Sequence, residues 1–314
     1  MRALERIRGT QRSSDVPVIL HRSGNGPRVA VTAGVHGDEL VGFAACNELD
    51  RVLNVTGGEV ILYPALNPAG VAARTRTHPE DQADLNRAFP GDPDGTAVER
   101  HAARVWRDLV ARRPTALIDL HADAATSIPY ALVDRVVNAS PPLPIDLEQR
   151  SISLAVASGL PVLREYPPEL YRRFRLDRSL AGAAMNYLGI PSVTLEVGPR
   201  RVIDPRGVAA AVAAVMAQLA HLGLVRGGPL AHPDPIRIRG NAPRARAAGL
   251  FLPHLPAGAS FHPGDCLGRV VGLDGEELDV LVADSTGIVV AWAEGGWVDV
   301  GAVPGTLGLE NGHG

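Results

Sequence analysis

Short apolar runs rich in β-branched residues alternate with segments of helical periodicity, and this alternation constrains the fold more than any other feature. The apolar runs predict strands at residues 18–21, 28–33, 59–65, 116–121 and 192–197. The periodic segments predict helices at residues 38–52, 97–112, 146–158, 179–188 and 205–222. Such alternation predicts an α/β domain with a mostly parallel or mixed sheet flanked by helices.

Two of these helices carry explicit start signals. Thr96 followed three residues later by Glu99 is the pattern of a capping box. Asp204 before Pro205 predicts an N-cap with proline at the first helical position, and Gly223 ends the same helix.

The character of the chain changes after Gly223. Residues 226–235 are rich in glycine and proline and predict a linker between a catalytic domain, residues 1–225, and a smaller domain. Residues 236–310 contain short apolar runs separated by glycine turns, which is typical of a small all-β domain. The last residues, 311–314, are expected to lack regular structure.

The chain contains no lysine, so all 31 of its basic residues are arginine. A Schiff-base lysine, a P-loop lysine and an attachment lysine for biotin or lipoate are therefore excluded. The two cysteines, Cys46 and Cys266, are too few for a disulfide framework and indicate reduced thiols.

The net charge of −3 and the 4% aromatic content give no indication of a nucleic-acid partner or an anionic membrane. The N-terminus has no signal-peptide pattern, and no apolar run is long enough to span a bilayer. A cytoplasmic location is therefore expected.

His36 and Glu39 form the first candidate site. They follow the strand at residues 28–33 and open the next helix, with Asp38 as its potential N-cap and Glu39 on its first turn. The carboxyl ends of parallel strands are where open α/β sheets bind ligands, and two ligands three residues apart can share one metal ion. The alternative is a helix start with an incidental histidine.

His121 ends the apolar strand at residues 116–121. Strand alternation places Asp119 on the same face, where a carboxylate can take the free ring N–H of a metal-bound histidine. The alternative is a histidine in the core or at its rim.

A polar, turn-rich stretch contains Asn67, Arg76, Asp84, Asn86 and Arg87. Arginine recognises carboxylates through two parallel hydrogen bonds, so Arg87 with Asn86 could clamp a substrate. The alternative is a solvated loop with a capping aspartate.

Glu196 interrupts the apolar end of the strand at residues 192–197. A carboxylate there needs a partner or a function, such as general base catalysis beside a metal-activated water. A structural ion pair is the alternative.

Taken together and in this order, these pieces resemble the succinylglutamate desuccinylase/aspartoacylase family, which is related to the zinc carboxypeptidases. The resemblance covers roughly residues 15 to 225. The matching segments are Gly34-Val35-His36-Gly37-Asp38-Glu39, Asn67-Pro68, Thr75-Arg76-Thr77, Asp84-Leu85-Asn86-Arg87-Ala88-Phe89-Pro90-Gly91, Asp119-Leu120-His121 and Glu196-Val197-Gly198.

The resemblance implies a zinc carboxypeptidase-like fold and a metal-dependent amidohydrolase that acts on linear amides. It implies one zinc ion per chain, bound by His36, Glu39 and His121, with Glu196 as the catalytic carboxylate. It further implies that Arg76 polarises the scissile carbonyl, and that Asn86 and Arg87 bind the carboxylate of a small anionic N-acyl substrate.

The family resemblance also implies a C-terminal β domain of lipoyl-like barrel shape. Without an attachment lysine, this domain is expected to cover the cleft or to mediate assembly, so a homo-oligomer is possible. An additional substrate-binding arginine, known in aspartoacylase, has no assigned position, and its candidates are Arg172, Arg173, Arg175 and Arg178. They lie in residues 166–177 and just beyond, a segment that is either a lid or a surface loop. His78 is a further possible substrate contact.

Two alternative functions stay open. A zinc carboxypeptidase acting on peptides would use the same metal site but needs an open groove, whereas a deacylase needs a small closed pocket. A non-catalytic relative with the same fold would not need a bound metal.

Overall fold

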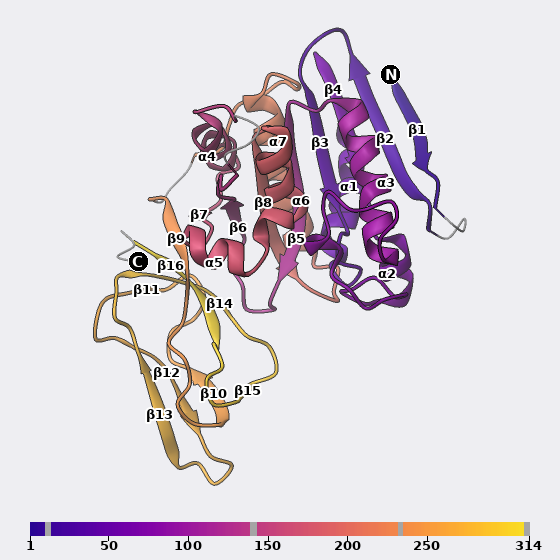
Figure 1. The fold of residues 1–314 in the computed structure, drawn as a ribbon. Helices are drawn as coiled ribbons and strands as arrows, with labels where there is room; N and C mark the ends of the chain where they lie inside the picture. The colour runs from indigo at the N-terminus through magenta and orange to yellow at the C-terminus, as the bar shows by residue number, and fades with distance from the viewer. Residues whose placement is uncertain (10–13, 139–142, 232–234, 311–314) are drawn as a thin grey trace.

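A computed structural model of the chain describes residues 1–9, 14–138, 143–231 and 235–310. Figure 1 shows an α/β body and a C-terminal all-β region that extends from one end of it. Residues 311–314, for which the sequence predicts no regular structure, lie outside the described ranges.

A mixed sheet of twelve strands forms the centre of the described structure. Its strands, in spatial order, are β1 (Arg2–Ile7), β2 (Val16–Ser23), β4 (Gly58–Tyr63), β3 (Arg28–Ala33), β5 (Ala116–Asp123), β8 (Ser192–Pro199), β6 (Tyr130–Val133), β7 (Val162–Arg164), β9 (Arg237–Asn241), β16 (Gly305–Leu309), β14 (Gly287–Trp292) and β11 (Ser260–Phe261).

Four neighbouring strands at the centre of the body, β4, β3, β5 and β8, run parallel to one another. Their carboxyl ends therefore meet at one edge of the sheet. The chain segments that follow β3 and β4, and the ends of β5 and β8, contain all four groups of candidate site residues. This topology alone brings His36, Asn67, His121 and Glu196 to the same edge.

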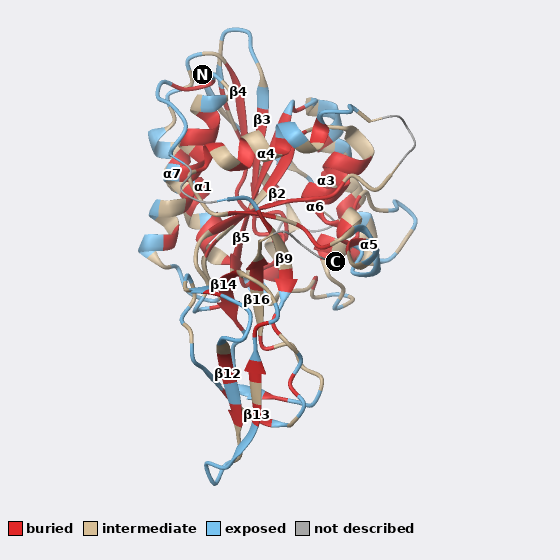
Figure 2. Ribbon diagram, turned by 90° about the vertical axis from the view of Figure 1, so that its left-hand side faces the viewer, coloured by how far each residue is buried: buried red, intermediate tan, exposed pale blue. Residues whose placement is uncertain are grey.

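Helices cover both faces of the sheet, and each face has its own apolar core (Figure 2). One core packs Ala45 and Leu154 with Ala211 against the side chains of Val29 and Val31. The other packs helix residues such as Val98 against the next strand residue, Ala30. Successive side chains of a strand point to opposite faces, so alternate residues of β3 pack into different cores. The helices are α1 (Leu40–Val52), α2 (Pro68–Ala73), α3 (Ala97–Arg112), α4 (Leu147–Ala157), α5 (Pro168–Arg173), α6 (Leu180–Ala183) and α7 (Pro205–His221), with shorter turns η2 (Leu85–Arg87), η3 (Leu176–Arg178) and η4 (Ala184–Leu188).

The predicted α/β class is confirmed, and the predicted strand 28–33 and helix 97–112 have the observed bounds. Thr96 and Glu99 form the expected capping box, and Asp204 accepts a hydrogen bond from the Gly207 N–H as the N-cap of α7. The helix predicted at residues 179–188 changes hydrogen-bonding pattern after Ala183, where the π-helical turn η4 begins.

Several short elements were not predicted. The edge strand β1 is mostly exposed and charged, so it lacks an apolar face that the sequence could reveal. Strands β6 and β7 have four and three residues, which is too short for a periodic pattern. Helices α2 and α5 have six residues each.

The C-terminal region contains no helix within its described residues, as predicted. Some of its strands extend the main sheet, and the others form a second sheet. Strand β9 pairs in parallel with β7, so β9, β16, β14 and β11 continue the main sheet. A second sheet has four strands, in the order β13 (Glu277–Val282), β12 (Cys266–Val271), β10 (Gly249–Pro253) and β15 (Trp297–Val298). The apolar core of the C-terminal region includes Phe251 of this sheet together with Phe261 and Trp292 of the main sheet. We still propose two domains, residues 1–225 and 236–310, joined by a linker at 226–235, with a lipoyl-like shape for the second. The two parts share the main sheet.

Candidate metal centre and substrate cavity

The turn between β3 and α1 presents His36 and Glu39. Gly34 has a φ of +64°, and a Cβ atom on Gly37 would lie 2.0 Å from the carbonyl carbon of Gly70. Both positions therefore require glycine for the turn to form. Helix α1 begins at Leu40 with Glu39 as its N-cap residue, so the prediction of Asp38 as the N-cap and Glu39 on the first turn was wrong by one residue. The Glu39 side chain makes no capping bond and is free to point into the site.

His121 and Asp119 lie in β5 and meet on one side of the strand, as their alternation predicts. His121 Nε2 lies 3.0 Å from Asp119 Oδ2, and Thr32 Oγ1 donates to Asp119 Oδ1 at 2.6 Å. Asp119 is fully buried. The contact fixes the ring orientation of His121 and leaves its Nδ1 to face Glu39.

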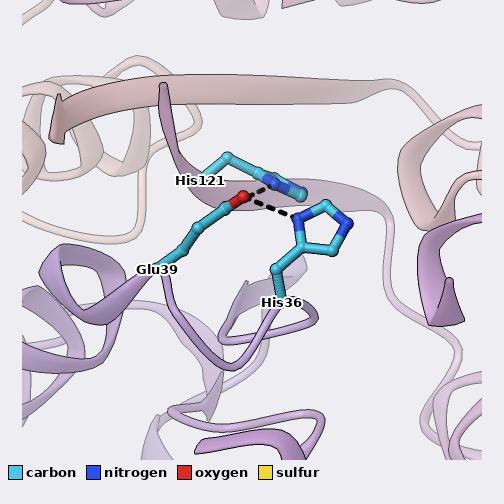
Figure 3. Close-up of side chains that lie close together, drawn as sticks. All are labelled: His36, Glu39 and His121. Atoms are coloured by element: carbon cyan, nitrogen blue, oxygen red, sulfur yellow. Dashed lines mark hydrogen bonds and ion pairs between the residues drawn. The ribbon is translucent and has the colours of Figure 1, made fainter. Parts of the chain in front are cut away.

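His36, Glu39 and His121 converge on one point (Figure 3). His36 Nδ1 lies 2.7 Å from Glu39 Oε1, and His121 Nδ1 lies 2.9 Å from Glu39 Oε2. One nitrogen or oxygen atom from each residue lies within 4.8 Å of the others, and all three residues are at most 3% exposed. Burial favours a neutral carboxyl group, but the charges of His36 and His121 hold the pKa of Glu39 well below its ordinary value. A buried carboxylate between two imidazoles is a donor set that suits a divalent metal ion.

The second ring nitrogen of His36 also faces a carboxylate. His36 Nε2 lies 3.1 Å from Asp84 Oδ1, which in addition accepts the Asn86 N–H as the cap of η2. Although burial favours the neutral acid, the hydrogen bond from His36 and the charges of Arg76 and Arg87 lower the pKa of Asp84. Sequence reasoning included this aspartate in the polar, turn-rich candidate stretch, with a capping role as the alternative, and assigned it no contact with His36. In the structure it supports His36 as Asp119 supports His121.

Arg76 lies beside this group of side chains. Its Nη1 donates to Glu39 Oε1 at 3.0 Å, and its Nη2 lies 3.7 Å from Asp84 Oδ2. Arg87 donates to two backbone carbonyls, those of Phe174 at 3.0 Å and Asn86 at 2.6 Å.

Asn86 is tied to the fold through its side-chain oxygen, which accepts the Leu180 N–H at 2.8 Å. The side-chain nitrogen of Asn86, Nδ2, donates to no acceptor among the described residues. Asn86 nevertheless lines the same cavity as Arg76 and Arg87. Part of this predicted carboxylate clamp thus has a structural task as well.

Glu196 lies near the end of β8, opposite His121 on one side and Tyr130 on the other. Burial and the neighbouring charges of Asp123 and Glu39 raise the pKa of Glu196 above its ordinary value. Its Oε2 is buried and has no hydrogen-bond partner among the described residues. Such an atom has unmet hydrogen-bonding capacity beside the candidate metal centre.

A cavity of about 190 Å³ joins these residues. Seven of the predicted site residues line it: His36, Glu39, Arg76, Asn86, Arg87, His121 and Glu196. The buried Asp119 does not. Sequence reasoning missed further polar lining residues because no motif contains them, among them Asp123, Tyr130, Asp134, Glu165, Arg200 and Arg239. Arg239 comes from β9, so the C-terminal region supplies part of the wall.

The four arginines proposed from residues 172–178 do not line this cavity. Arg172 donates to the Val137 carbonyl, and Arg172, Arg173 and Arg175 are exposed. His78 is buried against the ring of His101 and is also absent from the cavity wall. Of the predicted lid, the buried Leu176 does line the cavity.

The sequence of residues 25–222 matches the family model described as the succinylglutamate desuccinylase/aspartoacylase catalytic domain. The chain belongs to this family. The resemblance inferred from the ordered motifs is thereby confirmed.

One relative is the N-alpha-acetyl-L-2,4-diaminobutyric acid deacetylase of Halomonas elongata, which is 33% identical over 235 residues. The match covers 73% of the present chain and 64% of the relative, so the chain spans less than two thirds of that protein's length.

Solved structures of the family have the same fold along nearly the whole chain. A succinylglutamate desuccinylase/aspartoacylase from Rhodobacter sphaeroides has a TM-score of 0.78 at 26% identity, covering 98% of this chain and 96% of the other. The product-bound ectoine utilization protein EutE of Ruegeria pomeroyi has a TM-score of 0.80 at 25% identity, covering 99% and 95%. Among the described residues, no helix has both the length and the apolar character needed to cross a membrane.

Proposed function

We propose that this protein is a zinc-dependent hydrolase that cleaves the amide bond of a small N-acylated amino acid. The products are a carboxylic acid and a free amine. One observation carries this proposal above the others: the buried group of His36, Glu39 and His121 lies at a small polar cavity that Glu196 also lines.

The donor set fits a catalytic metal ion. Two imidazoles and one carboxylate leave a coordination position open, which distinguishes catalytic zinc sites from closed structural ones. Asp84 and Asp119 hold the outer nitrogens of the two rings, as carboxylates do around zinc-binding histidines. When bound, zinc supplies Lewis acidity, which brings the pKa of a water molecule to about 7 and polarises a carbonyl group.

Glu196 acts as the general base. Its buried position and the nearby carboxylates raise its pKa, which suits a group that must both take and return a proton. The unpartnered Oε2 is the atom that accepts the proton of the attacking water. Glu196 then passes this proton to the nitrogen of the leaving amine.

Arg76 stabilises negative charge that develops on the carbonyl oxygen. Its Nη1 lies 3.0 Å from Glu39, so the guanidinium borders the metal ligands. Arginine remains charged at any working pH, and a fixed cation at this place favours the tetrahedral transition state. Arg87 and the Nδ2 of Asn86 bind the carboxylate of the substrate from the cavity wall.

The size of the cavity favours a small substrate over a peptide. Pockets for drug-sized ligands are roughly 300–1,000 Å³, whereas this cavity is about 190 Å³. Arg239 of β9 forms part of its wall, so the C-terminal region limits the space above the catalytic domain. The name of the Halomonas elongata relative, a deacetylase of an N-acetylated amino acid, supports the same reaction class.

A hydrolysis panel on metal-defined protein tests the proposal. N-acetyl and N-succinyl amino acids and short peptides are incubated with chelator-treated protein, with and without added zinc, and free amine is measured. We expect zinc-dependent release of amine from N-acyl amino acids. Faster hydrolysis of peptides would support the carboxypeptidase alternative, and no hydrolysis of any substrate would contradict the proposal.

A further inference from the structure

A second cavity adjoins the substrate cavity, and the proposed reaction leaves it unexplained. Its volume is about 450 Å³, more than twice the 190 Å³ of the first, and its wall comes from both the α/β body and the C-terminal region. None of the candidate metal ligands lines it, so we call it the outer cavity and the first one the inner cavity. Asp123 and Arg200 line both, which places the junction of the two cavities at these side chains.

Asp123 supplies a carboxylate at this junction. It is the last residue of β5, two positions beyond His121. Tyr130 Oη donates to its Oδ2 at 2.9 Å, and no other described group donates to this carboxylate. Among the described residues, no basic side chain lies within ion-pair distance of it. The bond from Tyr130 therefore holds the carboxylate in place without balancing its charge.

Arg200 supplies a cation at the same junction. It directly follows β8, and its backbone N–H donates to the Asp123 carbonyl at 3.1 Å. Its Nε is buried and has no hydrogen-bond partner within the described parts of the chain. Its Nη2 lies 3.5 Å from Glu294 Oε2, beyond the usual length of such a bond. A buried N–H without an acceptor is unfavourable unless a ligand supplies one.

The two side chains do not neutralise each other. Their backbones are hydrogen-bonded, yet the carboxylate of Asp123 and the guanidinium of Arg200 lie outside ion-pair distance. Glu294 is exposed and also accepts the Ala125 N–H at 3.2 Å, so solvent screens its attraction to Arg200. The junction thus presents one anion without an ionic partner beside one cation with a loosely held partner.

We propose that Asp123 and Arg200 bind the free α-amino acid product as it passes from the inner to the outer cavity. This inference rests on the proposed amide hydrolysis at the metal centre. Water and the amide give a carboxylic acid and an amine, and transfer of the acid's proton to the amine leaves a carboxylate and an ammonium group. A free α-amino acid carries an ammonium group for Asp123 and a carboxylate for Arg200 on one carbon atom.

The same two side chains discriminate between product and substrate. The nitrogen of an N-acyl amino acid is an uncharged amide, so the substrate brings no cation to Asp123, and its carboxylate approaches that acid without compensation. The released acyl acid has a carboxylate only. Hydrolysis therefore creates the group that the junction recognises. Competition from Glu294 for Arg200 favours release of the amino acid over tight retention.

Inhibition of the zinc-loaded enzyme by L-alanine tests this inference, with an N-acetyl amino acid other than N-acetylalanine as substrate. Propionate lacks the ammonium group of alanine, and ethylamine lacks its carboxylate. We expect alanine to lower kcat, because it blocks the junction while substrate occupies the metal centre, and both analogues to do so about tenfold more weakly or less. Purely competitive inhibition by alanine, or equal inhibition by propionate, would overturn the inference.

Two variants should shift this inhibition in opposite directions. Arg200→Gln removes the cation, and we expect it to raise the inhibition constant of alanine by about tenfold or more. Glu294→Gln keeps an acceptor for the Ala125 N–H but removes the competing charge, and we expect it to lower that constant by about two- to fivefold. The exposed Arg206→Gln is the matched control. An unchanged inhibition constant in Arg200→Gln would contradict the assignment.

Binding separates a failure of this inference from a failure of the proposed reaction. If no N-acyl amino acid is hydrolysed, the proposed function fails, and calorimetry with L-alanine on chelator-treated protein still tests the site. We expect alanine to bind the unmodified protein, to lose this binding in Arg200→Gln and to keep it in Arg87→Ala, since Arg87 lines only the inner cavity. No binding to the unmodified protein, or a loss confined to Arg87→Ala, would overturn the site.

Discussion

The imidazole rings of His36 and His121 lie with their centroids 5.1 Å apart, although one follows β3 and the other belongs to β5. The parallel pairing of these two strands brings the rings together at one edge of the sheet. Glu39 lies between them and faces one nitrogen of each.

Asp84 is expected to strengthen metal binding by holding the ring of His36. Asp84→Asn keeps an acceptor for the Asn86 N–H but removes the charge that faces His36 Nε2. We expect the dissociation constant for zinc to rise about 10- to 100-fold, measured by competition with a chelating dye. Asp94→Asn, an exposed change in the following loop, is the control. Unchanged zinc affinity in Asp84→Asn would remove Asp84 from the metal centre.

Glu196→Gln tests the general base. The amide cannot accept a proton, so we expect kcat to fall by about 100-fold or more while one equivalent of zinc stays bound. Zinc content by elemental analysis and kcat on an N-acetyl amino acid are the two measurements. The exposed Glu276→Gln serves as the matched control. Turnover near that of the unmodified enzyme would exclude Glu196 from proton transfer.

Arg87→Ala tests substrate recognition. The guanidinium is proposed to bind the substrate's carboxylate in both the ground state and the transition state. We therefore expect KM to rise by about tenfold or more, with a smaller change in kcat. Arg173→Ala removes an exposed arginine that does not line the cavity and should leave both constants unchanged. If KM stays the same in Arg87→Ala, the carboxylate binds elsewhere.

The raised pKa of Asp134 predicts how stability depends on pH. Burial and the charges of Glu165 and Asp119 raise the pKa of Asp134 from 3.8 to about 7. The Tyr171 hydrogen bond and the charge of Arg87 oppose this increase only in part. Between these two values the folded state binds the proton more strongly than the unfolded state does. Asp134 therefore lowers the free energy of unfolding as pH rises through this range, and the full penalty is present above about pH 7.

Asp134→Asn should remove this dependence. The free energy of unfolding in urea is measured for both proteins between pH 4 and pH 8. The difference, Asp134→Asn minus unmodified protein, should grow over this range by an amount on the order of a few kcal/mol. Measurements on chelator-treated protein keep metal release out of the comparison. A difference between the two proteins that is independent of pH would show that Asp134 titrates normally.

The sequence predicts the catalytic part of the fold well because its central strands are buried on both faces. Residues 29–31 and 116–118 are apolar runs inside these two strands, and helix 97–112 has both an amphipathic pattern and a capping box. The metal candidates follow from the same elements, since strand ends have a defined position in a parallel sheet. The one-residue error at Glu39 arises because its side chain faces the site and makes no capping bond.

The far wall of the cavity could not be predicted for a physical reason. Asp134 and Glu165 follow strands of four and three residues, and Arg239 joins the wall only because β9 pairs with β7. This pairing links distant parts of the chain, and no local pattern encodes it. The sequence suggested arginines in residues 172–178 instead, but Arg172, Arg173 and Arg175 are exposed, and none of the four candidates lines the cavity.

Zinc titration with a simultaneous assay tests the central claim most directly. Chelator-treated protein is titrated with zinc, and hydrolysis of an N-acetyl amino acid is followed at each addition, beside His121→Ala as a variant lacking one proposed ligand. Activity should rise linearly and stop rising at one equivalent of zinc per chain, and His121→Ala should show no such rise. Full activity in protein that retains less than about a tenth of an equivalent of metal would contradict the account.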